Sequence, residues 1–262
     1  MKNLISIAAM FFSVLILQGC KEGMDLKPQD YFEGKQLTIA EVIYHGDEAT
    51  LKKMLPTFSK EELNHPAKEN ITLLFFAVLN TTSSNITPER LRIITALVKA
   101  GADPLQPRPN GGSCPAEFVL KGDNGVWIKA MLDGGLSPNA LDKVHNQPII
   151  FEAFKAKNIE TLKVMLEYGA DINTKNSLGN SLLIDALDSR AYDHVIYLLD
   201  KGADSSIQGN SGWTMGNQLQ RFINRTQEGT ETWDKLEEIK TTLIKHGGEW
   251  PPKPVKKQPP LS

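Results

Sequence analysis

The side chains that most often carry chemistry in proteins are thinly spread along this chain. The five histidines stand far apart in the sequence, at His45, His65, His145, His194 and His246. None of them belongs to an H-E-x-x-H or Cys/His pattern with the spacing of a zinc site. The sequence therefore predicts no metal site, and nothing in it calls for a cofactor.

Two short segments resemble functional motifs but are explained better as turns. GNSGW at 209–213 resembles a nucleophile elbow, yet that motif is G-x-S-x-G between a strand and a helix. DINTKNSLGN at 171–180 resembles a calcium loop, but it lacks the alternating acidic residues and the closing glutamate. Asparagine and glycine favour turns. We interpret both segments as turns and predict that the protein is not an enzyme.

The two cysteines have different surroundings. Cys114 could be a reactive thiolate at the start of a helix, but it stands where a small residue opens a repeat, and we interpret it as structural. Cys20 follows Lys2 and an apolar run from Leu4 to Leu17, which is too short to span a bilayer and has the length of a signal-peptide core.

The segment Leu17-Gln18-Gly19-Cys20 resembles a bacterial lipobox. The resemblance implies that residues 1–19 are a lipoprotein signal peptide and that Cys20 carries lipid; the alternative is an ordinary signal peptide with a chance cysteine. Lys21 in place of aspartate implies sorting to the outer membrane. We therefore expect a periplasmic, lipid-anchored protein that contacts the membrane only through this lipid.

Charge and composition narrow the kinds of partner. The 262 residues include 29 lysines and arginines and 31 acidic residues, a net charge of −2, so no strong positive field favours nucleic acid. Residues 20–35 show little periodicity and are expected to form a membrane tether. Residues 251–262, PPKPVKKQPPLS, are rich in proline and lysine and are expected to form a flexible tail.

One phrase recurs between the tether and the tail. ALVKAGADP, AMLDGGLSPN, VMLEYGADIN and YLLDKGADSS place glycines at Gly101, Gly135, Gly169 and Gly202, which are 34, 34 and 33 residues apart. Each copy combines an amphipathic helix, such as 159–167, with a glycine that can end it in a left-handed conformation. Such helix pairs must stack on neighbours to bury their apolar faces.

These residues resemble the ankyrin repeat, with its pattern T-P-L-H and closing G-A-D-x-N. Residues 169–173 match the closing motif in full, and Cys114, Pro148 and Ser181 occupy the threonine position. The histidine of the pattern is absent from every copy, so the hydrogen bonds it makes between turns cannot be assumed. Weaker copies at 38–55, 72–101 and 214–247 complete the set. The resemblance implies an all-α, ankyrin-like solenoid of about six helix-turn-helix repeats over residues 36–250.

Ankyrin-like proteins bind partners with their turn tips and the exposed side of their first helices, so the resemblance places the binding face there. The register of the repeats puts eighteen polar, charged or aromatic residues on this face, suited to a protein epitope: Lys68, Glu69, Arg108, Asn110, Lys121, Lys143, His145, Gln147, Lys155, Asn176, Ser177, Asn180, Asp188, Arg190, Asn210, Ser211, Trp213 and Arg221. For any one of them, a merely solvated role is as good an explanation.

A lipid-anchored ankyrin-like protein without catalytic groups is similar to the ankyrin-repeat lipoproteins that act as immunity proteins against phospholipase effectors of type VI secretion systems. This resemblance implies that a monomer binds a secreted lipase-type toxin in a 1:1 complex and neutralises it. The alternative is an envelope scaffold or assembly factor that binds an endogenous periplasmic protein. Nothing in the residues themselves identifies the partner.

Overall fold

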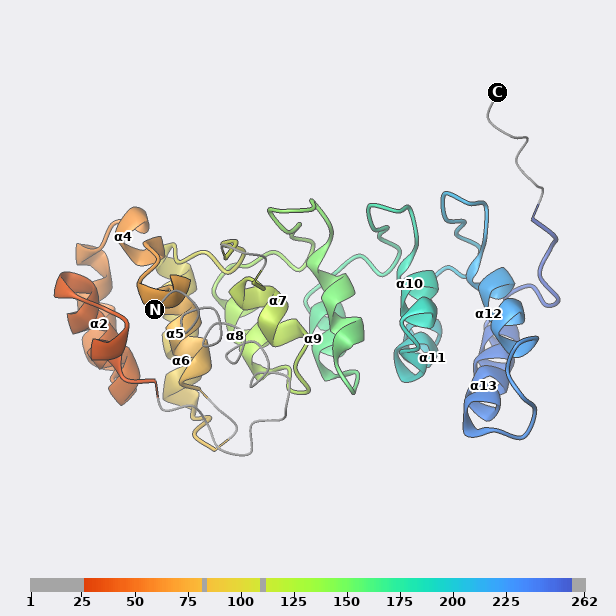
Figure 1. Ribbon diagram of the computed structural model, residues 1–262, viewed down its shortest axis with the longest axis horizontal. Helices are drawn as coiled ribbons and strands as arrows, with labels where there is room; N and C mark the ends of the chain where they lie inside the picture. The colour runs from red at the N-terminus through yellow and green to blue at the C-terminus, as the bar shows by residue number, and fades with distance from the viewer. Residues whose placement is uncertain (1–25, 82–83, 109–111, 256–262) are drawn as a thin grey trace, which may run out of the picture. The chain divides into compact units, whose positions relative to one another are not determined.

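The computed structural model describes residues 26–81, 84–108 and 112–255, and within these residues the regular structure is helical, with only isolated β-bridges besides (Figure 1). The chain divides into two compact units, Met1–Asp103 and Pro104–Ser262, and each is described by itself. In the described residues, no helix is long and apolar enough to cross a membrane.

Unit 1 contains two helix pairs and a short additional helix. The pairs are α2 (Gly34–His45) with α3 (Glu48–Met54), and α5 (Leu73–Leu79) with α6 (Pro88–Ala100). Between them lie η2 (Leu55–Thr57), α4 (Lys60–Asn64) and η3 (Lys68–Asn70). The sequence pattern predicted both pairs but not α4, which depends on a local capping box between Ser59 and Glu62.

The packed part of unit 1 begins earlier than the sequence suggested. The 3₁₀ helix η1 (Pro28–Asp30) precedes α2, and Leu26 and Phe32 are both buried. The ring of Phe32 meets that of Phe76 edge to face, with centroids 5.1 Å apart. Residues 26–35 were expected to belong to the membrane tether, but Leu26, Pro28 and Phe32 in this range are buried in unit 1. The remainder of that segment, including Cys20, lies outside the described residues.

Unit 2 contains four helix pairs in succession. They are α7 (Pro115–Leu120) with α8 (Val126–Asp133), η5 (Ile149–Lys155) with α9 (Glu160–Glu167), α10 (Leu182–Asp188) with α11 (Tyr192–Asp200), and α12 (Met215–Ile223) with α13 (Glu231–Lys245). With the two pairs of unit 1 these make the six repeats that the sequence predicted. The all-α, ankyrin-like fold class is confirmed.

The first helix of most pairs begins at a side chain that caps it. Thr72, Cys114, Ser181 and Thr214 each accept a hydrogen bond from the backbone N–H three residues further on. Cys114 is buried and caps α7 through its sulfur, which agrees with the structural interpretation of this cysteine. Pro148 occupies the same position without a capping side chain, and the helix that follows it, η5, is a 3₁₀ helix.

Glycines and small residues close and pack the repeats as expected. Gly101, Gly135, Gly169 and Gly202 all have positive φ, which an L-residue with a side chain adopts only with strain. The small residues at the centres of η5 and α10, Ala153 and Ala186, are completely buried. The absence of a larger side chain there lets the two helices of a pair approach closely.

Asparagines, rather than the missing histidine, link successive turns. Asn139 Nδ2 donates to Gly169 O at 3.1 Å, and its Oδ1 accepts from Asp171 N at 2.7 Å. Asn173 Oδ1 accepts in the same way from Asp204 N at 2.9 Å. The last residue of the G-A-D-x-N pattern thus binds the turn of the following repeat.

The C-terminal segment packs against the last repeat as far as Val255. Asn217 Nδ2 on α12 donates to Lys253 O at 2.8 Å, and Lys240 Nζ lies 5.7 Å from the ring centroid of Trp250. Pro252 lies close to Gly216, within α12. Residues 251–255 were expected to belong to a flexible tail and instead cover α12; residues 256–262 lie outside the described residues.

Candidate functional site

Three hairpin-like loops of unit 2, which we call the fingers, form the first part of the site. They comprise residues 142–147, 176–180 and 209–213, and each is closed by a backbone hydrogen bond from its first N–H to its last carbonyl, 2.8 to 2.9 Å long. They precede η5, α10 and α12, and their loops project to the same side of this unit in Figure 1. The segments GNSGW and DINTKNSLGN contribute two of them, which confirms both as turns.

Buried polar side chains hold two of the fingers in shape. The Asp142 carboxylate accepts hydrogen bonds from the N–H groups of Val144, His145 and Gln147, at 2.5 to 2.9 Å. Burial alone would raise the pKa of Asp142, but these backbone hydrogen bonds outweigh it and hold the pKa below its usual value. Asn176 does the same in the next finger, where its Oδ1 accepts from Leu178 N and Asn180 N.

Neighbouring fingers touch one another. Ser177 Oγ donates to Gln147 Oε1 at 3.2 Å, and Lys175 Nζ donates to Gln208 O at 3.0 Å. Gly179 lies so close to Asn210 that a Cβ at this glycine would overlap the amide side chain. The three fingers therefore form one continuous edge.

The second part of the site is a row of side chains on the first helices, which we call the charged row. The positions are counted from the residue that precedes each first helix of unit 2. The residues four positions further on are polar in the last three repeats: Glu152, Asp185 and Gln218. The residues seven positions further on are charged in all four repeats: Lys121, Lys155, Asp188 and Arg221. Residues three apart lie on the same face of a helix. The two positions therefore repeat along unit 2 as one polar strip beside the fingers.

Contacts between repeats join the members of this strip within its first half and within its second half. Glu152 accepts from Lys121 at 3.0 Å and from Lys155 at 2.7 Å, which links the first two helices. Gln218 donates its side-chain amide to Asp188, which links the last two. Arg221 lies over the ring of Trp213, 5.6 Å from its centroid, and its guanidinium reaches only to 4.0 Å from Asp188 Oδ1.

The acidic members of the site have altered proton affinities. Burial is the main cause that raises the pKa of Asp185 to about 6, and the charge of Asp188 adds to it. Burial also raises the pKa of Asp188, against the opposing effect of Arg221. Burial and the charge of Glu152 raise the pKa of Glu117, which closes the capping box of α7.

Most of the predicted binding residues fall on these two features. The charged row contains Lys121, Lys155, Asp188 and Arg221, and the fingers carry Lys143, His145, Gln147, Ser177, Asn180, Asn210, Ser211 and Trp213. Lys68 and Glu69 lie exposed in η3 of unit 1. Arg108 is half-buried in a bridge to Gly112, and Asn110 lies outside the described residues.

Two predicted contact residues are placed elsewhere. Asn176 is buried, 8% exposed, and both of its amide atoms are used inside the protein, so it positions the finger instead of presenting a surface. Arg190 lies in the turn between α10 and α11, with φ of 58°, at the end of α10 away from the finger. The sequence register counted Arg190 as part of the exposed face of α10, but this helix ends at Asp188 and Arg190 lies in the turn that follows it.

Sequence reasoning missed several residues of this surface. Glu152 and Asp185, and the buried Gln218 that donates to Asp188, all stand four residues after a capping position, a signal that the repeat register contained. Val144 and Leu178 are the other omission: they are 65% and 68% exposed at the tips of two fingers. As aliphatic residues they were not counted among candidates for a polar binding face.

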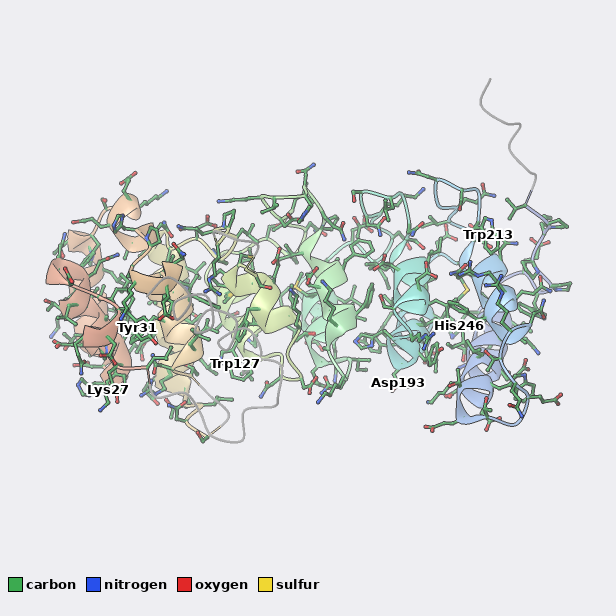
Figure 2. The ribbon with its side chains drawn as sticks, in the orientation of Figure 1. Lys27, Tyr31, Trp127, Asp193, Trp213 and His246 are labelled. Carbon is green, nitrogen blue, oxygen red and sulfur yellow. The ribbon has the colours of Figure 1, made fainter. Side chains whose placement is uncertain are left out.

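The fingers and the charged row together present a polar surface with a few exposed aliphatic side chains. Within the described residues, no group of three or more His, Cys, Asp or Glu side chains could hold a metal ion. Trp213 stands beside the start of α12, on the finger side of unit 2. Asp193, near the start of α11, stands on the opposite side, where the two helices of a repeat are joined (Figure 2). The fold and this face define a stacked-repeat protein with a binding edge.

One protein-family model matches part of this chain. Residues 118–208 match the family model for ankyrin repeats, described as three copies. Over these residues the chain is similar to ankyrin repeats, as the sequence motifs indicated. A scaffold of this kind is a protein-binding one.

Curated relatives match this chain over only a small part of their own length. Alpha-latrocrustotoxin-Lt1a of Latrodectus tredecimguttatus is 29% identical over 125 residues, which cover 47% of this chain and 9% of the toxin. Putative ankyrin repeat protein L86 of Acanthamoeba polyphaga mimivirus is 26% identical over 191 residues, 68% of this chain and 28% of that protein. The chain thus spans less than a third of the length of either relative.

Solved structures agree with the fold. The ankyrin repeat domain of Bcl-3, a member of the IkappaB protein family, has a TM-score of 0.58 at 24% identity, covering 80% of this chain and 86% of that one. An ankyrin repeat domain from Acinetobacter baumannii AYE has a TM-score of 0.54 at 17% identity, covering 82% and 100%. At these identities the likeness is one of fold.

Proposed function

We propose that this protein is a non-enzymatic, protein-binding lipoprotein of the periplasm that neutralises a phospholipase-like effector of a type VI secretion system by stoichiometric binding. The observation that best supports binding is that the fingers and the charged row extend over several successive repeats. Fingers that touch one another stand beside a charged row that runs over four successive repeats. Such a surface matches the extent of an epitope better than that of a small molecule.

Two histidines and one serine of the described residues have surroundings that a binding protein needs no further explanation for. His194 is 2% exposed with its ring against Phe154, and His246 bonds Asp200 at 2.9 Å, so both histidines have structural surroundings. Ser211 stands exposed on a finger tip. We infer inhibition by coverage: the fingers and charged row clamp the toxin and block its active-site entrance or a motion that opens it.

The proposed location rests on the N-terminal sequence, which lies outside the described residues. The lipobox-like segment ending at Cys20 would anchor the protein at the membrane that the effector attacks. An inhibitor held there meets the toxin before it reaches lipid. The anchor and the binding face would thus serve one purpose.

The decisive experiment is a competition assay. A strain without this protein should be killed by attackers that carry the cognate effector, and the gene supplied in trans should restore survival. Equal survival of the deletion strain and its parent would refute the immunity role. Replacing Cys20 with alanine should move the protein from membranes to the soluble periplasmic fraction and weaken protection.

A pull-down from the periplasm separates this function from its alternative. Recovery of a secreted lipase-like protein in equimolar amount would support immunity. Recovery of a resident periplasmic protein, in cells never exposed to attackers, would support an envelope scaffold or assembly factor. The two outcomes assign the same binding face to different partners.

A further inference from the structure

We propose that the fingers 142–147 and 176–180, together with the carboxylates of Asp185 and Asp188, form a docking surface for a basic, extended segment of the partner protein. An apolar side chain of that segment packs on the finger tips, and an arginine or lysine enters beside the carboxylates. The inference rests on the proposed binding function and deepens it by stating the chemistry of the partner.

The finger tips supply the apolar half of the surface. Val144 and Leu178 are 65% and 68% exposed, and the Ser177–Gln147 hydrogen bond holds their two fingers together. Leu141, at the base of the first finger, is also exposed, at 42%. Isolated exposed aliphatic residues are ordinary. Val144 and Leu178 differ in that they stand at the tips of two hydrogen-bonded fingers with polar side chains around them, an arrangement typical of interaction sites where the apolar surface is contiguous.

The acidic half lies directly beneath the second finger. Asn176 closes that finger with its Oδ1 and donates from Nδ2 to Asp185 Oδ1 at 2.8 Å. Asp188 follows one helical turn further along α10, about 4.5 Å along the axis. A segment of a few residues can therefore touch Leu178 and both carboxylates at once.

The basic side chains near Asp185 and Asp188 are mostly engaged by other groups. Lys121 and Lys155 are both engaged by Glu152, and the Arg221 guanidinium stacks over Trp213 at the 4.0 Å limit from Asp188. Among the described residues, Asp185 makes no ion pair. Partial burial makes the remaining negative charge costly, which favours a partner that supplies a cation.

A guanidinium or ammonium group meets this requirement more directly than other chemistry. It pairs with Asp185 and Asp188 through charge-assisted hydrogen bonds, in two-pronged geometry where the group is arginine. An acidic segment would be repelled, and a neutral segment would desolvate the carboxylates without compensation. The surface therefore selects by charge and gains affinity from the apolar tips.

The test uses the full chain and three fluorescein-labelled peptides, Gly-Ser-Leu-Ser-X-Leu-X-Ser-Gly, in which X is Arg, Gln or Glu. Fluorescence anisotropy at pH 7.5 should give a Kd for the Arg peptide about tenfold or more below that of the Gln peptide, with the Glu peptide weaker still. No binding by any peptide, or equal binding by the Arg and Glu peptides, would overturn the proposal.

Matched variants locate the contact. The double variant Asp185→Asn/Asp188→Asn should weaken the Arg peptide about tenfold and abolish the preference over Gln, and Val144→Ser/Leu178→Ser should weaken the Arg and Gln peptides equally. Asp193→Asn is the control, because Asp193 is exposed at the other end of the repeats and pairs with Lys235 at 3.2 Å. Equal weakening by the control would contradict the assignment.

The pH dependence gives a readout that a merely structural role would not produce. Asp185 is faced by Asp188 on its own helix and by Asn176 on the finger, and the neighbouring helices contribute Lys155, Glu152, Gln218 and Arg221. Lowering the pH from 7.5 to 5 protonates Asp185 and should reduce affinity for the Arg peptide but not for the Gln peptide. Affinity for the Arg peptide that stays constant across this range would refute the ion pair.

The competition assay keeps this inference separate from the proposed function. If the deletion strain is killed and the Asp185→Asn/Asp188→Asn protein protects as well as the wild type, the immunity role stands and the basic docking surface is wrong. If the deletion strain survives, the immunity role fails. In that second case the peptide measurements alone decide the inference.

Discussion

The amide of Asn176 joins the two halves of the candidate site, because the side chain that closes a finger also donates to Asp185 Oδ1 on α10 at 2.8 Å. The geometry of the finger and the ionisation of the carboxylate are therefore coupled. Replacing Asn176 with alanine removes three hydrogen bonds to buried or half-buried groups. We expect a loss of about 2–3 kcal/mol in the free energy of unfolding.

Urea denaturation checks this value, with Asn210→Ala as the control on an exposed finger tip. The control should cost well under 1 kcal/mol. Similar losses in the two variants would show that Asn176 does not organise the finger.

The raised pKa of Asp185 predicts a stability that falls as the pH rises. A carboxyl group with a pKa of about 6 in the folded protein and an ordinary value of 3.8 favours folding when protonated, so its contribution is lost between about pH 4 and pH 6. The full difference corresponds to at most about 3 kcal/mol. Because the group is partly exposed, we expect about 1–2 kcal/mol.

Asp185→Asn tests this directly, because the amide keeps an oxygen that can accept from Asn176. The variant should lose the decline in stability over that range and should be at least as stable as the wild type at pH 7. A wild-type slope that persists in the variant would assign the effect to another group.

His194 should make the protein less stable as the pH falls, which is opposite to the effect expected of Asp185. Burial lowers its pKa below the ordinary value of 6.5, and its Nε2 is a buried nitrogen without a hydrogen-bond partner in the described part of the chain. The unfolded chain binds a proton below pH 6.5 while the folded protein resists it, so stability should fall as the pH is lowered through this region. His194→Gln should flatten the acid side of the profile, whatever its effect on absolute stability.

Thermal denaturation at intervals from pH 7 to pH 5 measures that slope. His246→Gln is a useful comparison, since His246 pairs with Asp200 at the surface. An unchanged acid slope in His194→Gln would exclude the buried imidazole as its cause.

Much of this fold could be predicted because repetition makes local signals redundant. The glycines that end the helices, such as Gly169, and the capping residues, such as Ser181, are local requirements that a sequence displays openly. Burial of Phe32 against Phe76 could not be inferred in this way, because it joins segments distant along the chain and lies outside the repeat. The tether was consequently assigned too many residues.

The binding face was predictable in register but not in detail. The repeat predicted the positions of Lys121, Lys155, Asp188 and Arg221, since each stands seven residues after a cap. Whether a polar residue at such a position is exposed or buried depends on its neighbours in space. Asn176 is buried because its amide satisfies the finger, a contact that the sequence does not reveal.

The segment from Pro251 to Val255 should contribute to the stability of the last repeat. Lys253 O accepts from Asn217 on α12, and Pro252 and Val255 lie against Gly216 and Gly212. A chain that ends at Trp250 loses these contacts and exposes the last repeat, so its free energy of unfolding should fall by about 1–2 kcal/mol. The matched truncation, which ends at Val255, keeps these contacts and should therefore unfold at a higher urea concentration than the chain that ends at Trp250. If both truncations were equally destabilised, the stabilising contacts would lie beyond Val255. If neither were, the packing of residues 251–255 on α12 would contribute nothing to the stability of the repeat.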